Sequence, residues 1–196
     1  MEIVLQADQK AFLWLNGWVG QFPWLDGVMR LLVSDYLIPV VLALILLGLW
    51  FGFPATVERW RAHYGVMSGL MGIGLSNQAV ELFNQFIFRP RPFVDLEVAL
   101  LFYKPTDSSF PANPAALAFA IAVSVWLWSR TAGAVCLLLG VLYSVSRVYA
   151  GVSYPLDVLG GAVIGTVTAL LASLVLRKWD LLPTFVLRIA KAFYLA

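Results

Sequence analysis

Hydrophobic residues form long, nearly uninterrupted runs along most of this 196-residue chain, and short polar segments separate them. Such runs predict membrane-spanning helices, because a helix needs about 20 apolar residues to cross the hydrocarbon core of a bilayer. Several of the runs are shorter than that, so their ends are approximate. The pattern predicts five spans, at residues 31–51, 64–88, 114–128, 132–148 and 156–176.

Both ends of the chain carry a weaker, amphipathic pattern. Residues 4–18 contain Asp8 and Lys10, which are too polar for the membrane interior. The apolar residues of this stretch nevertheless recur at helical spacing: Val4, Ala7, Ala11, Trp14 and Trp18. Residues 182–194 repeat the theme, with Arg188 set among apolar residues. A helix with one apolar and one polar face lies in the plane of a membrane surface, so we expect interfacial helices at both ends.

The composition is that of a membrane protein. Hydrophobic residues make up 61% of the chain and charged residues 12%, which is more apolar surface than a soluble domain of this size can bury. We therefore expect residues 1–196 to form a single all-α membrane domain, a bundle of about five transmembrane helices with interfacial helices at both termini. The net charge of +2 is small and the basic residues are scattered, which argues against a nucleic-acid partner. The lone cysteine, Cys136, lies in an apolar run, where we expect a small buried side chain.

The basic residues divide unevenly between the two sides of the membrane if the five spans alternate. One side holds seven of them: Arg59, Arg61, Arg130, Arg177, Lys178, Arg188 and Lys191. The other side holds only Lys10, Arg30 and Lys104, apart from three arginines in the motifs described next. Because basic loops tend to stay in the cytoplasm, we expect the first side to be cytoplasmic and the opposite face to be external.

Three short segments carry the candidate chemistry, and each lies at the outer end of a predicted span. In chain order they are residues 84–93, which run from Asn84 to the sequence R-P-F, SFPANPAA at 109–116 and SRVYAGVSYPLDVLGG at 146–161. These segments resemble the three signatures of the type 2 phosphatidic acid phosphatase family. The chain also resembles the small bacterial undecaprenyl-pyrophosphate phosphatases of that family over nearly its whole length. This resemblance implies a helical bundle in a bacterial inner (cytoplasmic) membrane, with the motif face external.

The resemblance implies a mechanism whose main groups are replaced in this chain. In the family, a histidine of the third motif attacks phosphorus, and the aspartate four residues later orients it. A second histidine protonates the leaving group, while a lysine, two arginines and the serine of the second motif hold the phosphoryl oxygens. This chain keeps Arg91, Arg147 and Asp157. Four positions depart: Asn84 replaces the lysine, Ala112 the serine, Pro114 the second histidine and Ser153 the nucleophile.

These departures remove the family's mechanism. A missing general acid costs about 10²- to 10⁴-fold in rate and a missing nucleophile roughly 10⁶-fold. Ser153 needs a base before it can act as a nucleophile, and Asp157 alone is a poor base near neutral pH. The chain's one histidine, His63, is expected at the opposite end of the second span. We therefore expect no catalytic residues and, because no cluster has metal-ligand spacing, neither a metal nor another cofactor.

Charged and polar residues around the motifs are candidates for binding a phosphate or a lipid. We assign this role to six residues: Glu81, Arg89, Arg91, Asn113, Arg147 and Asp157. An alternative stays open for Arg147 and Asp157, which can form a structural ion pair instead. Asn113 and Pro114 also make a good helix start, with the asparagine as N-cap and the proline at the first position. Asp107 is expected to be a solvated loop charge.

Glu81 lies on a polar face of the second predicted span, at helical spacing from Asn77 and Asn84. An intramembrane carboxylate is by default a candidate functional residue, and we expect Glu81 to pair with Arg91 or Arg147 across a cavity. The alternative is a hydrogen-bonded network that joins neighbouring helices.

Three functions remain open at this point. The first is a pseudoenzyme, a catalytically inactive family member that keeps part of an anion or lipid-phosphate cavity and binds or moves a phospholipid or polyprenyl phosphate. The second is an accessory structural subunit of a larger membrane protein complex. The third is an active phosphatase that hydrolyses undecaprenyl pyrophosphate or phosphatidate with unanticipated groups.

Overall fold

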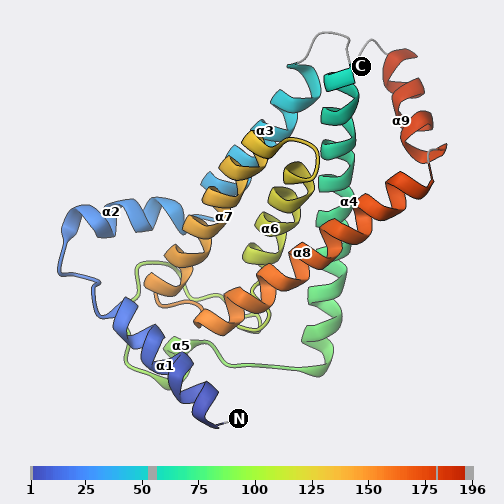
Figure 1. Ribbon diagram of the computed structural model, residues 1–196. Helices are drawn as coiled ribbons and strands as arrows, with labels where there is room; N and C mark the ends of the chain where they lie inside the picture. Colours follow the sequence, from blue (N-terminus) through green and yellow to red (C-terminus); the bar gives the residue numbers. More distant parts are fainter. Residues whose placement is uncertain (1, 53–56, 180, 193–196) are drawn as a thin grey trace.

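The computed structural model describes residues 2–52, 57–179 and 181–192. These residues form helices and connecting loops without a strand, which confirms the all-α expectation (Figure 1). In chain order the helices are α1 (Glu2–Asn16), α2 (Pro23–Leu32), α3 (Leu37–Phe51), α4 (Val57–Phe86), α5 (Pro92–Asp95), α6 (Asn113–Trp126), α7 (Arg130–Tyr149), α8 (Pro155–Lys178) and α9 (Leu181–Ala192).

Helix α6 is the central helix of the bundle. Its most extensive contacts are with α8, and it also packs against α4 and α7, so that these three helices enclose it (Figure 1). Small side chains line these contacts and let the helix backbones approach closely. The buried small residues of α6 are Ala115, Ala116, Ala118, Ala120, Ala122 and Ser124.

Two glycines of α8 make its close approach to α6 possible. A Cβ atom placed on Gly165 would lie 2.2 Å from the carbonyl oxygen of Ala116, and one placed on Gly161 would lie 2.2 Å from that of Ala112. No side chain fits at such distances in a close-packed interior. Because α6 begins within the second motif and α8 within the third, this packing fixes the two motifs relative to each other.

A larger apolar core lies where α3 and α7 join the bundle. Ile38, Leu42 and Leu46 of α3 pack with residues of α4, α6 and α7 in one buried cluster. Cys136 of α7 belongs to this cluster and is fully buried, as the sequence predicts.

Helix α1 lies across the end of the bundle that carries the three motifs (Figure 1). Phe12 is fully buried against Val148 and Tyr154. The Asn16 side chain donates a hydrogen bond to the carbonyl oxygen of Tyr149 at 2.8 Å. The amphipathic helix predicted near the N-terminus is therefore present and is attached to the motif end by apolar and polar contacts.

The C-terminal helix predicted over residues 182–194 is also present, as α9. Its Leu187 is buried against Tyr64 and Leu176 at the end of the bundle opposite the motifs. Phe193 and Tyr194 lie outside the described residues.

The predicted spans correspond to helices, with one clear difference. By length and composition α7 and α8 can each cross a membrane. Helices α2 and α3 form a bent pair, which makes a third candidate if the two helices together form a single span. These two helices meet at 53°, so the predicted span 31–51 combines the end of α2 with α3. Helix α6 is apolar but shorter, and α4 begins seven residues before the predicted span. The number of five spans stays a prediction.

The basic residues that the sequence places on one side gather at one end of the bundle. The start of α4 and the start of α7 lie at the same end, and the motif loops lie at the other (Figure 1). Trp128, two residues after the end of α6, has its ring centroid 5.1 Å from that of Tyr64 and 4.9 Å from the Arg177 guanidinium. Residues of α4 and α8 and the segment after α6 therefore meet at this basic, aromatic end.

Replacing Gly165 with leucine tests the packing of α6 against α8. Gly165→Leu forces the two helices apart, and overpacking of this kind costs about 1–3 kcal/mol. For a chain of this size we expect the thermal midpoint in detergent to fall by roughly 5–10 °C. The control is Gly74→Leu on α4, where a Cβ would meet nothing within 4 Å. Equal midpoints for the two variants would show that this contact does not limit stability.

Candidate functional site

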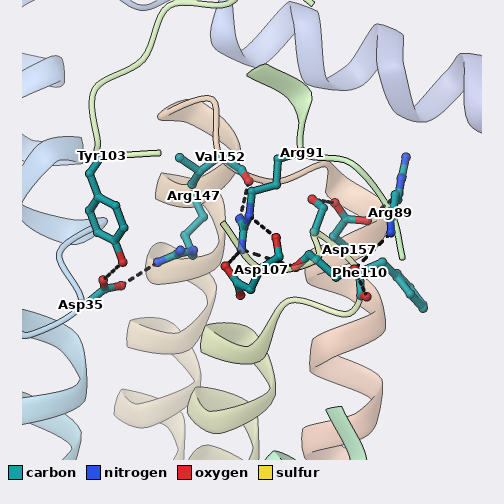
Figure 2. A network of polar contacts seen from close by, with 11 residues as sticks. Asp35, Arg89, Arg91, Tyr103, Asp107, Phe110, Arg147, Val152 and Asp157 are labelled. Carbon is teal, nitrogen blue, oxygen red and sulfur yellow. Dashed lines mark hydrogen bonds and ion pairs between the residues drawn. The ribbon is translucent and has the colours of Figure 1, made fainter. Parts of the chain in front are cut away.

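Backbone hydrogen bonds bring the three motifs together at one end of the bundle. The amide of Ser109 donates to the carbonyl oxygen of Arg89 at 2.9 Å, which joins the second motif to the first. The amide of Ala112 donates to the carbonyl oxygen of Asp157 at 2.9 Å, which joins the second motif to the third. The charged side chains of all three motifs consequently form one row across this end (Figure 2).

Asp157 is the most completely enclosed charge of this row. It lies in the first turn of α8, and its side chain is 0% exposed. The carboxylate accepts hydrogen bonds from the Ser109 hydroxyl, from the Tyr154 amide at 2.9 Å and from Arg89 Nη1 at 2.5 Å. The helix N-terminus adds a favourable dipole for the negative charge. Both carboxylate oxygens are therefore occupied by donors from the protein itself.

Arg89 bridges two carboxylates from opposite ends of the chain. Its Nη2 donates to Asp8 Oδ2 at 2.7 Å, and its guanidinium lies 4.2 Å from the ring centroid of Tyr154. Partial burial alone would lower the pKa of Arg89, but the hydrogen bond to Asp8 and the charge of Asp157 outweigh it, so the pKa is raised. Asp8 in turn accepts the amide hydrogen of Leu156 at 2.9 Å. Arg89 thus ties α1 to the start of α8.

Sequence reasoning did not assign a role at the site to Asp8. The residue was expected to belong to the polar face of an interfacial helix, yet its side chain is only 1% exposed. Asp8 and Phe12 are four residues apart and therefore share one face of α1, which is the face packed against the bundle. A charged residue at helical spacing from a large apolar one is only a weak signal that the charged residue is buried, because many surface helices show the same spacing.

Arg91 uses all three of its guanidinium nitrogens within the protein. Nη2 donates to Asp107 Oδ1 at 2.8 Å, Nε to the Asp107 carbonyl oxygen at 3.0 Å and Nη1 to the Val152 carbonyl oxygen at 2.7 Å (Figure 2). Asp107 is therefore an ion-pair partner, which corrects the expectation of a purely solvated loop charge, although its side chain stays 61% exposed. Arg91 and its loop also line a cavity of about 310 Å³ together with Lys104 and Phe93.

Arg147, in the last turn of α7, is buried and only partly satisfied. It is 3% exposed, and its Nη1 donates to Asp35 Oδ1 at 3.1 Å. Its Nε is buried and has no hydrogen-bond acceptor in the part of the chain that the structure describes. Asp35 also accepts a hydrogen bond from the Tyr103 hydroxyl at 2.7 Å, which raises the pKa of Tyr103. Arg147 is thus a buried cation with one N–H group that has no acceptor among the described residues.

The two positions that should hold catalytic histidines are occupied by groups without acid-base chemistry. Ser153 is 1% exposed in the loop between α7 and α8. Pro114 lies in the first turn of α6 and has no proton to donate. The helix begins at Asn113, which is exposed and does not cap it; the N-cap position is Ala112. The expectation that Asn113 is the N-cap is therefore wrong by one residue.

Glu81 does not pair with the motif arginines. It is exposed on α4, whereas Arg91 and Arg147 pair with Asp107 and Asp35. The expected ion pair is wrong because the loops that meet these arginines bring carboxylates of their own. The polar face itself exists, since Asn77, Gln78 and Gln85 are also exposed on α4; Asn84 is half-buried, and its Oδ1 has no donor within the described residues.

His63 lies far from the motifs, as expected. It is near the start of α4, with its ring stacked on Trp50 at a centroid distance of 4.3 Å and its Nε2 2.9 Å from the Trp50 carbonyl oxygen. The motif end of α4 is 23 residues further on, or about 35 Å along a helix. Among the described residues, no group of three His, Cys, Asp or Glu side chains is placed to hold a metal ion. The charged groups at the motif end are therefore arginines paired with the carboxylates of Asp157, Asp107 and Asp35.

Removing Arg89 tests whether it compensates the buried charge of Asp157. Arg89→Ala leaves the carboxylate without its ion-pair partner, a loss that typically costs about 3–5 kcal/mol. We expect a marked fall in the thermal midpoint of unfolding, of which the double variant Arg89→Ala with Asp157→Asn regains a large part. The matched control is Arg30→Ala, which removes an exposed arginine of α2. If Arg89→Ala unfolds like this control, the ion pair contributes nothing to stability.

The sequence and the fold were compared with known proteins. The sequence model of the PAP2 superfamily matches residues 65–180. Undecaprenyl-diphosphatase BcrC of Bacillus subtilis (strain 168) is 34% identical over 162 residues, which cover 83% of this chain and 79% of BcrC. The putative undecaprenyl-diphosphatase YbjG of Escherichia coli (strain K12) is 27% identical over 165 residues, which cover 84% of this chain and 80% of YbjG.

Two crystal structures share the fold. LpxE of Aquifex aeolicus superposes with a TM-score of 0.64 at 29% identity and covers 84% of this chain and 93% of its own. The first transmembrane PAP2 type phosphatidylglycerolphosphate phosphatase from Bacillus subtilis superposes with a TM-score of 0.65 at 23% identity, covering 91% of this chain and 88% of its own. In this chain, α7 and α8 are each long and apolar enough to cross a membrane, as expected of an integral membrane protein. The match over more than half of its length and the BcrC relationship show that this chain belongs to the PAP2 superfamily, the family its three motifs resemble.

Proposed function

We propose that this protein binds a lipid phosphate at the motif end of the bundle and does not hydrolyse it. The observation that carries the proposal is the occupancy of Asp157, whose oxygens already accept hydrogen bonds from Arg89, Ser109 and the Tyr154 amide. In the family this aspartate orients the third-motif histidine. In this chain Ser153 stands at that position, and a serine is not a base. On this proposal the family's binding function persists and its turnover does not.

Hydrolysis requires a group that attacks phosphorus and a group that handles the proton. A serine hydroxyl must lose its proton to a base as it attacks, and Asp157 is engaged with a cation and two donors. At the leaving group, Pro114 cannot act as an acid. His63 is too distant to substitute for either. No described residue near the motifs therefore supplies the two proton transfers that the reaction needs.

Arg147 is the residue that favours a bound anion. An arginine carries five N–H donors, and a buried one that leaves donors unmatched pays a free-energy cost. Here Nη1 is bonded to Asp35, while Nε has no acceptor within the described residues. A phosphate oxygen would supply that acceptor through a charge-assisted hydrogen bond. Arg91 is fully engaged, so we assign it a flanking role.

The chemical class of the ligand follows from the relatives. BcrC is named an undecaprenyl-diphosphatase, so its substrate is a membrane lipid that ends in phosphate. We propose the same class for this chain, a polyprenyl phosphate or a phospholipid with an accessible phosphate. Residues 1–196 would act as one domain in the bacterial inner membrane, with the motif end on the external side.

A second candidate is an accessory subunit of a membrane complex. The observation that favours it is the exposed polar face of α4, which comprises Asn77, Gln78, Glu81 and Gln85. Polar side chains at membrane depth are costly unless they meet water or another helix. A second polypeptide that purifies in fixed proportion with the protein, and is lost in Glu81→Leu, would favour this function.

Two substitutions of opposite effect test the binding proposal. Arg147→Met removes the cation and should weaken the binding of undecaprenyl phosphate or phosphatidate about 10- to 100-fold, the effect of a lost charge-assisted hydrogen bond. Asp35→Asn removes the carboxylate that competes for Arg147 and should strengthen binding. Equilibrium binding of the radiolabelled lipids to purified protein in detergent measures both.

The control is Arg130→Met, which removes an exposed arginine at the opposite end of the same helix. It should bind like the unmodified protein. If Arg147 has only a structural role, Asp35→Asn should not strengthen lipid binding. That result would contradict the proposal. Phosphate release during the same incubations would favour an active phosphatase instead.

A further inference from the structure

An apolar groove runs along the outside of the bundle between α7 and α8. The two helices leave the loop 150–154 in diverging directions (Figure 1). Phe119 of α6 lies between them in a groove of about 310 Å³. The groove begins at Leu15 of α1 and continues along Val148, Ser144 and Val141 of α7. On α8 its wall is formed by Pro155, Val158, Leu159 and Ala162.

Ser144 is the one polar residue among those that line this groove. Ser144 is 5% exposed, and its Oγ has no hydrogen-bond partner in the part of the chain that the structure describes. A serine within a helix usually bonds a carbonyl oxygen of the preceding turn. Ser146 does so, donating to the Tyr143 carbonyl oxygen at 2.7 Å, and Thr168 does so with Gly165 at 3.0 Å. The Ser144 hydroxyl differs from these two in having no hydrogen-bond partner among the described residues.

With the motif end of α7 placed at the membrane surface, Ser144 lies at about the level of the lipid ester groups. It lies five residues before the motif end of α7 at Tyr149, or about 7.5 Å below that end. The interfacial layer of a bilayer is roughly 5–8 Å thick on each side, and the ester carbonyls lie where this layer meets the hydrocarbon. Below Ser144 the groove is lined by apolar residues alone.

We propose that this groove holds one acyl chain of a diacyl glycerophospholipid, with the ester carbonyl oxygen accepting a hydrogen bond from Ser144. The occupant is a lipid because the walls are apolar and two residues that line the groove, Val145 and Leu159, are 37% and 58% exposed on the outside of the bundle. It is an ester lipid because a polyprenyl chain has no acceptor along its hydrocarbon. The site uses neither Arg147 nor Asp157, so it stands or falls independently of the function proposed above.

Competition between two lipids that differ only in the carbonyl groups tests this assignment. Purified protein is mixed with equal amounts of a diacyl and a dialkyl-ether phosphatidylglycerol of the same chain length, and the retained lipid is counted by native mass spectrometry. The unmodified protein should retain the ester lipid about fivefold better, the effect of one net hydrogen bond. Ser144→Ala should reduce this preference to about one while lipid is still retained.

A matched pair of substitutions on α8 tests the groove itself. Ala162→Phe fills the groove and should abolish retention of both lipids. Val163→Phe, on the adjacent residue that is 62% exposed outside the groove, should behave like the unmodified protein. Equal retention of ester and ether lipid by the unmodified protein would overturn the proposal. So would an ester preference that survives Ser144→Ala, or displacement of the diacyl lipid by equimolar undecaprenyl phosphate.

Discussion

The ion pair between Arg89 and Asp157 is the interaction on which the motif end of this protein depends. A carboxylate that is 0% exposed is tolerated only when a cation and hydrogen-bond donors compensate its lost hydration. Arg89 supplies the cation, and through Asp8 the same guanidinium holds α1 against the start of α8. Because Ser109 bonds the same carboxylate, all three motifs and the N-terminal helix meet at one buried charge.

On the proposed function, this arrangement gives the retained part of the catalytic signature a structural role. Asp157 also accepts the Tyr154 amide at the start of α8, so the fold needs the carboxylate even where no histidine is present for it to orient. Arg147 differs from it in having a buried nitrogen without an acceptor among the described residues. Structural demand accounts for Asp157, whereas Arg147 is better explained by a ligand. The proposed function rests on this difference.

The sequence predicts the helices of this fold better than the partners of its charges. The span predicted at 132–148 corresponds to α7, Arg130–Tyr149. This agreement arises because the apolar run and the polar residues at its ends are local features of the sequence. The carboxylates that pair with the motif arginines were not predicted. Asp8, Asp107 and Asp35 lie 81, 16 and 112 residues from their partners, and only the folded loops and α1 bring them together. Hydropathy carries no information about such pairings, whereas the expectation that the three motifs lie at the same end of the bundle agrees with the structure.

The most direct test of binding without turnover is a phosphorus NMR measurement on undecaprenyl diphosphate mixed with an equimolar amount of the purified protein. The account predicts that the diphosphate resonances broaden or shift on binding and persist for hours, with no inorganic phosphate signal. Inorganic phosphate and undecaprenyl monophosphate appearing together, and absent with the Ser153→Ala, Asp157→Asn double variant, would contradict it and identify an active phosphatase.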